Sequence, residues 1–163
     1  MQIRKLHTSD AAGFHALRLE GLRVCPEAFG ASFEEESRLS VADVAKRLAA
    51  GCVFGGFSDA GRLEGVVGLA QSQTSKTRHI ATIWGMYVRP EARGGGLAGA
   101  LMEAAMAEAD GTCTSIRLSV VSTNQAALRL YKRMGFTPWA VDREALLVDG
   151  VYFDEVLMRR SCP

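Results

Sequence analysis

The sequence predicts a mixed α/β fold in which helices cover both faces of a central sheet. Segments with a two-residue apolar alternation are interspersed with segments of helical apolar spacing along the whole chain. One strand segment, His79–Val88, is apolar on both alternating faces, which is typical of a strand in the middle of a sheet. Near the C-terminus Asp149-Gly150 lies between apolar residues, which is the strongest short-range hairpin signal in the chain.

Length and composition predict a single cytoplasmic domain that spans residues 1-163. Hydrophobic residues make up 48% and charged residues 23% of the chain, as in an ordinary soluble protein. The net charge of +1 and the absence of Lys or Arg runs argue against nucleic acid or a membrane as partner. The N-terminus lacks the apolar stretch of a signal peptide. The four cysteines show no C-x-x-C spacing, so no metal is expected.

The first third of the chain predicts one strand and two helices. Gln2–Leu6 favours a short strand, and Thr8-Ser9-Asp10 provides N-cap side chains for a helix that ends near Pro26. A loop is expected over Glu27–Leu39, after which Ser40 caps the second helix. The apolar faces of these two helices are Phe14, Leu17, Gly21 and Val24 in the first and Val41, Val44, Ala45 and Leu48 in the second.

The middle of the chain predicts sheet. Cys52–Phe57 and Leu63–Gln73 flank the turn Ser58–Gly61 and are expected to form a hairpin. The strand His79–Val88 follows. A strict alternation divides its apolar side chains into Ile80, Trp84, Met86 and Val88 on one face and Ala81, Ile83 and Tyr87 on the other.

The second half alternates between helix and strand. Gly96–Asp110 predicts an Ala-rich helix, Ser115–Val121 a strand, and Asn124–Met134 a second helix. Pro138–Leu147 and Val151–Arg159 flank the Asp-Gly turn and are expected to pair antiparallel.

A glycine-rich loop between the central strand and a helix predicts an anion site. Pro90 ends the strand, and Gly94, Gly95 and Gly96 lead into the helix. Because glycine lacks Cβ, backbone N–H groups there can turn toward one anion and approach it closely. The helix adds its free N-terminal N–H groups, and Arg93 adds a positive charge. This arrangement favours a pyrophosphate, and the alternative is a glycine-rich turn without a ligand.

Two other phosphate motifs fit the loop less well. A P-loop needs Lys followed by Ser or Thr after its last glycine, whereas Gly99 is followed by Ala100-Leu101. Gly94-x-Gly96-x-x-Gly99 matches the dinucleotide pattern, but the acidic residue expected about 20 residues later is missing. A nicotinamide-binding module is therefore a minor alternative.

The chain resembles the GNAT superfamily of N-acetyltransferases in element order, most sharply over Trp84–Phe136. The family's cofactor signature, Arg/Gln-x-x-Gly-x-Gly/Ala, is met by Arg93–Ala98, and the lead-in Trp84–Pro90 is similar to the family's central strand. The second signature is met at the right distance by Asn124–Phe136. The resemblance implies a mostly antiparallel central sheet and transfer of an acetyl group from acetyl-coenzyme A (acetyl-CoA) to a primary amine.

The resemblance also implies the residues that bind the cofactor. The backbone of Met86 and Val88, with Tyr87 between them, would bond the pantetheine arm like an added strand. Asn124 would contact the pantetheine, or act only as an N-cap. The helical spacing independently places Ala127, Leu130, Tyr131 and Met134 on one inward face. The pyrophosphate would be held by the loop residues Arg93, Gly94, Gly95, Gly96, Leu97 and Ala98.

In the family the acceptor amine attacks the acetyl carbonyl directly, and this chain offers no nucleophile and base arrangement for an acyl-enzyme. Tyr131, with an unperturbed pKa of about 10, suits a general acid that protonates the departing thiolate. Its alternative is a core aromatic with a satisfied hydroxyl. The identity of the general base stays open, because the central strand has no carboxylate. The candidates are Glu34, Glu35, Glu36 and a water chain.

In the family the segment Pro26–Glu36 walls the acceptor site, and the residues expected to bind substrate are Phe29, Phe33, Glu35 and Trp84. The acidic residues can instead be a solvated charge run. The acceptor is a small-molecule amine or a protein N-terminus. The rival function is a catalytically silent CoA-binding sensor or interaction module. The oligomeric state is also left open, and an exposed C-terminal strand could pair with its copy across a homodimer.

Overall fold

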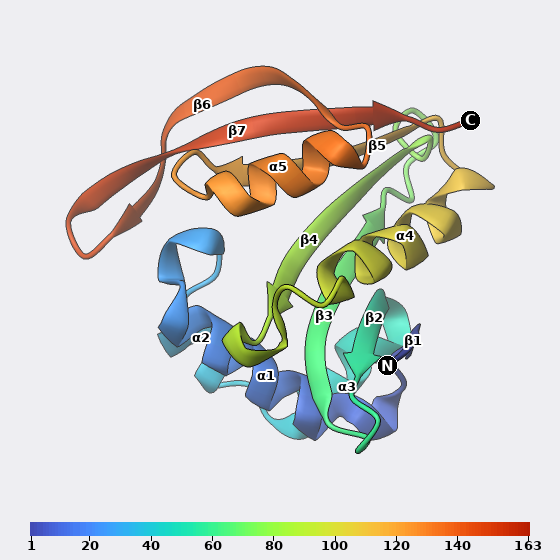
Figure 1. Cartoon of the computed structure of the whole chain (residues 1–163), viewed down its shortest axis with the longest axis vertical. Coiled ribbons are helices and arrows are strands. Elements are labelled where there is room, and N and C mark those ends of the chain that lie inside the picture. Colours follow the sequence, from blue (N-terminus) through green and yellow to red (C-terminus); the bar gives the residue numbers. More distant parts are fainter.

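The computed structural model describes residues 1–163 and contains one seven-stranded sheet with the strand order β1-β2-β3-β4-β5-β7-β6 (Figure 1). Every neighbouring pair is antiparallel except β4 and β5, which are parallel. The strands are β1 Gln2–Lys5, β2 Cys52–Phe57, β3 Leu63–Gln71, β4 Ile80–Val88, β5 Ser115–Val121, β6 Thr137–Val148 and β7 Val151–Ser161. The helices are α1 Ala11–Val24, α2 Phe33–Ser37, α3 Val41–Ala50, α4 Leu97–Asp110 and α5 Gln125–Arg133, with 3₁₀ turns η1 Thr8–Asp10, η2 Pro26–Ala28 and η3 Pro90–Ala92.

Helices cover both faces of the sheet, so the predicted mixed α/β fold is confirmed (Figure 1). On one face α4 and α5 enclose a core that includes Leu101 and Phe136. On the other face α1 and α3 enclose a second core that includes Leu17 and Leu48. No helix of the structure combines the length and the apolar character needed to cross a membrane.

Two residues predicted to be buried are exposed instead. Val24 is 52% exposed and Val41 is 51% exposed. Val24 is the last residue of α1 and Val41 the first of α3, so both lie at helix ends, beyond the turns that pack on the sheet. Helical periodicity correctly predicted the inner residues of these faces but not where the packed part of each helix ends.

The predicted loop Glu27–Leu39 contains a helix, α2, that was not expected. Ser32 Oγ accepts a hydrogen bond from the Glu35 N–H at 3.1 Å, and the Glu35 carboxylate accepts one from the Ser32 N–H at 3.2 Å. This reciprocal pair is a capping box, and its Ser-x-x-Glu spacing is visible in the sequence. Because α2 spans only 5 residues, it is too short to show a helical apolar period.

Strand β4 contains a β-bulge that the strict alternation did not anticipate. Val66 of β3 pairs with Tyr87 and Gly68 pairs with Trp84, so β4 has one residue more than β3 in this stretch. The extra residue is accommodated at Gly85, which has a φ of 63°.

The bulge reverses which side chains face which core. Ala81 and Ile83 pack in the α4 core together with Val88, whereas Tyr87 packs in the α1 core. The predicted grouping of Tyr87 with Ala81 and Ile83 is therefore wrong. One inserted residue shifts every later side chain of a strand to the opposite face.

Strands β4 and β5 pair only at their beginnings and then separate. Their parallel register extends from Ile80 opposite Ser115 to Thr82 opposite Arg117. Beyond these pairs the two strands diverge toward the side where η2 and α5 lie (Figure 1). The divergence leaves an edge of β4 without a partner strand in the middle of the sheet.

Candidate functional site

The gap between the diverging strands opens into a cavity of about 720 Å³. The end of β4, the glycine-rich loop and the first turns of α5 form its walls, with η2 at one side. The predicted cofactor residues that line it are Met86, Tyr87, Val88, Arg93, Gly94, Gly96, Leu97, Ala98, Asn124, Ala127 and Tyr131. Gly95 belongs to the same loop but does not line the cavity.

The glycine-rich loop presents free backbone donors to this cavity. None of the N–H groups from Gly94 to Gly99 donates a hydrogen bond within the chain. Gly94 and Gly96 are left-handed, with φ of 82° and 83°, and Gly96 is the N-cap of α4. A Cβ built on either residue would meet nothing within 4 Å. The loop therefore combines unpaired donors, open space and the positive end of a helix, which together suit an anion.

Arg93 lies beside these donors but is oriented by the end of β4. Its Nε donates a hydrogen bond to the Val88 carbonyl at 2.9 Å. Its guanidinium carbon lies 5.9 Å from the centroid of the Tyr87 ring. These contacts hold the guanidinium close to the cavity, so its positive charge adds to the field of the α4 N-terminus.

The free edge of β4 directs backbone groups into the cavity. The N–H of Arg89 donates to the carbonyl of Glu64, next to β3. Hydrogen-bonding groups alternate in direction along a strand, so Met86 and Val88 direct theirs away from β3 and toward the gap. An extended chain with amide groups can pair with this edge as an additional strand.

Tyr87 also lines the cavity, but its side chain packs in the α1 core. The hydroxyl donates a hydrogen bond to Glu20 of α1 at 3.1 Å. Burial is the main cause that raises the pKa of Tyr87 to about 12, and the hydrogen bond to Glu20 adds to it. Glu20 also forms an ion pair with Arg89. The side chain of Tyr87 is thus part of the packing between α1 and β4.

Tyr131 extends from α5 into the cavity. Its side chain is 6% exposed and packs edge-on against Phe136, with ring centroids 6.2 Å apart. Burial raises the pKa of Tyr131 to about 12. The hydroxyl has no hydrogen-bond partner in the chain, yet it is not a fully buried unsatisfied atom, so it opens to the cavity. A protonated hydroxyl in this position can donate to a bound group.

Asn124 caps α5 and also lines the cavity. Its Oδ1 accepts a hydrogen bond from the N–H of Ala127 at 3.1 Å. The side-chain NH₂ makes no hydrogen bond within the chain, so it remains free to donate. The two alternatives that the sequence left open for Asn124 are therefore compatible in this geometry.

A second cavity, of about 650 Å³, lies between the η2–α2 segment and the tip of the β6–β7 hairpin. Phe29, Phe33 and Glu35 line it, as expected for a substrate wall. Phe29 lines both cavities and so lies between them. Trp84 is not in this group; it lines a small gap of about 60 Å³ between β4 and β5. The structure thus brings together three of the four predicted substrate residues.

Glu36 is not an available carboxylate. It is 7% exposed and pairs with Arg18 at 3.1 Å and with Arg47 at 3.2 Å. Burial opposes its charge, but the hydrogen bonds and charges of the two arginines outweigh burial and lower the pKa of Glu36. The ion pairs tie α1, α2 and α3 together. The carboxylate of Glu35 is already the acceptor of the α2 capping box.

Several lining residues were missed in the sequence. Leu130, which the helical spacing already placed on the inward face of α5, lines the cavity, and so does Arg133, which follows Leu130 by three residues. Cys25, Glu27 and Ala28 reach the cofactor cavity from η2 and the residue before it, and the tip Ala145–Asp149 walls the second cavity. Glu27 and Ala28 fall in the segment Pro26–Glu36 that was expected to wall the acceptor site, whereas nothing local in the sequence marks the hairpin tip, because its position depends on distant packing.

The sequence also matches the profile of a known protein family. The sequence profile of the Acetyltransferase (GNAT) family matches residues 17–136. The chain therefore belongs to the GNAT family of acetyltransferases and is an acyltransferase.

Solved structures share the fold along the whole chain. An acetyltransferase of the GNAT family from Streptococcus pneumoniae is 22% identical, with a TM-score of 0.88 and coverage of 99% of both chains. The protein yncA of Salmonella typhimurium, solved with its cofactor acetyl-CoA, is 20% identical, with a TM-score of 0.82 over 100% of this chain and 94% of that one. A phosphinothricin acetyltransferase of Sinorhizobium meliloti, in complex with acetyl-CoA, is 17% identical, with a TM-score of 0.84 over 99% and 88%.

Proposed function

We propose that the chain is an N-acetyltransferase that moves the acetyl group of acetyl-CoA to a primary amine by direct attack in a ternary complex. The observation that carries the proposal is the set of unpaired N–H groups in the loop from Gly94 to Gly99, whose residues other than Gly95 line the same cavity as Tyr131. The loop suits the pyrophosphate, and Tyr131 lies where a thioester carried on an extended arm would end. Two structures of the same fold contain acetyl-CoA.

Each part of the cofactor has a fitting partner in the cavity. The amides of the loop would hold the pyrophosphate, and Arg93 would add a charge beside it. The Met86 and Val88 backbone would pair with the amides of the pantetheine arm, and the free NH₂ of Asn124 would donate to the same arm. Bound acetyl-CoA would supply an activated acyl group with a thiolate as leaving group.

The residues around the thioester would then position it and transfer protons. The amine would attack the carbonyl carbon, whose oxygen would accept a hydrogen bond from a free N–H of β4. As the carbon–sulfur bond breaks, Tyr131 would protonate the thiolate. Because burial raises its pKa to about 12, Tyr131 is protonated at neutral pH and can act as this acid. Positioning two bound reactants would supply much of the rate.

The acceptor would enter from the second cavity, past Phe29, and be a small-molecule amine or a protein N-terminus. The test is thiol release from acetyl-CoA by the purified chain with a panel of amines, amino acids, polyamines and peptides with free N-termini. We expect thiol release that depends on one class of amine, with the acetylated product identified by mass spectrometry. Tight CoA binding without release by any amine would instead favour a catalytically silent sensor.

A further inference from the structure

A carboxylate pair lies on the sheet face opposite α5, near the gap between β4 and β5. Val120 of β5 is buried in the α4 core, so the alternation of the strand turns Ser119 and Val121 to the other face. Glu155 of β7 pairs with Val121, and Asp142 of β6 pairs with Glu155. Directly paired residues point to the same face, so Ser119, Glu155 and Asp142 share it.

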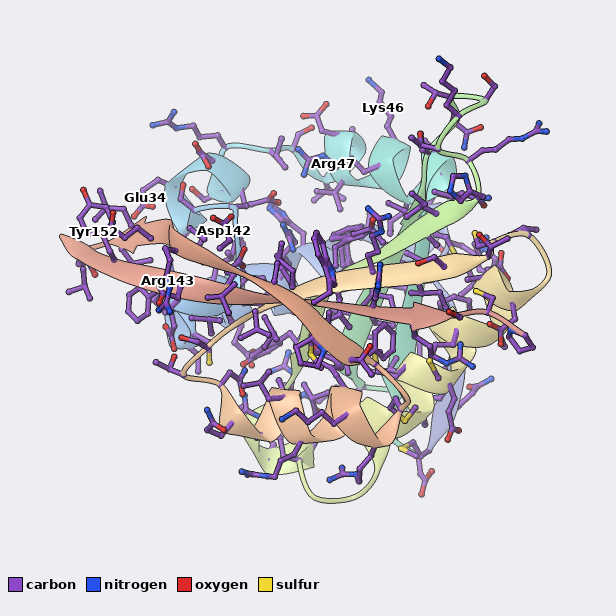
Figure 2. All side chains as sticks on the ribbon, turned by 90° about the horizontal axis from the view of Figure 1, so that it is seen from above. Glu34, Lys46, Arg47, Asp142, Arg143 and Tyr152 are labelled. Atoms are coloured by element: carbon purple, nitrogen blue, oxygen red, sulfur yellow. The ribbon has the colours of Figure 1, made fainter.

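This face is turned toward the wall of the predicted acceptor site. Figure 2 shows Asp142 on the side of β6 that faces α2, while the next residue, Arg143, points the opposite way. The turn η2 contacts both β5 and β6. Ser119 lines the small gap between β4 and β5 together with Trp84 and Tyr131. Glu155 is the strand partner of Val121, which also lines this gap, and it shares the face of Ser119, opposite the face from which Tyr131 reaches the gap.

Glu155 has no cation that fixes it as a structural ion pair. Neither Glu155 nor Asp142 forms a salt bridge. The neighbouring Arg143 pairs instead with Asp154, at 2.6 Å. Burial raises the pKa of Glu155, a hydrogen bond with Ser119 opposes that rise, and the charge of Asp142 adds to it. Two like charges directly opposite each other destabilise a sheet, and an unpaired carboxylate with a raised pKa is typical of a functional base.

Other charged groups around this face are remote or already paired. Arg117 and Arg159 face each other further along the strands, toward the opposite end of the face. Arg18 of α1, which lies 5.5 Å from the Trp84 ring, is held by Glu36. The competing carboxylates are Glu27 of η2, which lines the first cavity, and Glu34, Glu35 and Asp149, which line the second.

We propose that Glu155 is the general base of the reaction and accepts a proton from the acceptor ammonium, directly or through one water bound by Ser119. This inference rests on the proposed N-acetyltransferase function. The ammonium gives one proton to Glu155, which releases it to solvent, and the free amine attacks the thioester. The carbon–sulfur bond breaks, Tyr131 protonates the thiolate, and the second proton of the nitrogen restores the Tyr131 hydroxyl. The products are the amide and the free thiol.

The test is the pH dependence of kcat/KM for the wild type, Glu155→Gln and Asp142→Asn, with an amine that the wild type acetylates. Glu155→Gln should lower kcat/KM about 10²-fold or more at neutral pH and remove the acidic limb of the profile. The affinity for CoA and the circular dichroism spectrum should not change. Asp142→Asn removes a charge that raises the pKa of Glu155, so the acidic limb should move to lower pH. A merely structural role of Glu155 would not produce this shift.

The outcomes separate this inference from the function on which it rests. If the wild type transfers acetyl and Glu155→Gln keeps both its rate and its acidic limb, Glu155 is not the base, but the function stands. If Glu27→Gln loses the limb instead, the base comes from η2 and the assignment to Glu155 is overturned. If the wild type releases no thiol with any amine, the proposed function fails, and with it the role of Glu155.

Discussion

A carboxylate at Gly96 would place a negative charge inside the loop that we propose to hold the pyrophosphate. Gly96 caps α4, and a Cβ there meets no atom within 4 Å, so Gly96→Asp can be accommodated without a clash. Two unit charges about 4 Å apart repel by about 4 kcal/mol at the effective dielectric constant of a protein surface. Since each 1.4 kcal/mol or so is a factor of about ten, we expect CoA to bind about a thousandfold more weakly.

The matched control is Gly96→Asn, which has nearly the same size and the same backbone strain but no charge. Asn tolerates the left-handed conformation that φ of 83° imposes better than most residues do. Isothermal titration calorimetry with CoA, at low and at physiological salt, should show much weaker binding for the Asp variant than for the Asn variant. The difference should shrink as salt rises, because the loop is exposed. Equal affinities of the two variants, both folded, would refute the anion site.

Three further predictions concern the acid, the acceptor side and stability. Tyr131→Phe removes only the hydroxyl, so kcat should fall about 10²-fold while the Kd for CoA is unchanged; an unaltered kcat would remove Tyr131 from the chemistry. Gly68→Ala would drive a Cβ into the indole of Trp84, so the KM for the amine should rise more than the KM for acetyl-CoA, and equal changes would argue against Trp84 as an acceptor contact. The hydrogen bonds of Arg4 hold the pKa of Asp10 at about 2, below its unfolded value of about 3.9. This stabilisation is complete above that unfolded value and is lost as the pH falls toward about 2, so in urea titrations Asp10→Asn should cost about 1 kcal/mol at neutral pH and almost nothing near pH 2.

Local features of the chain could be predicted from the sequence because their causes lie within a few residues. Gly94 and Gly96 adopt positive φ, which glycine allows at little cost, and the loop they form leads into a helix as expected. The Asp149-Gly150 turn has φ of 50° and 79°, as its two-residue hairpin requires. Asn124 caps its helix within three residues, and helical spacing correctly placed Tyr131 on an inward face.

The acceptor side of the site was decided only by tertiary structure. The bulge at Gly85 turns Tyr87 toward α1. The sequence did not predict this bulge, because an inserted residue is defined by the pairing of β4 with β3 and leaves no trace in the apolar pattern. From the sequence, Glu36 was a candidate for the general base. In the structure it forms ion pairs with Arg18 and Arg47, which are distant in the sequence. Glu155 lay in a correctly predicted strand, but its position near the gap follows from the register of β7 on β5. Which side chains meet across two strands depends on the pairing register of those strands. Residues far apart in the chain set that register, so local sequence patterns do not predict it.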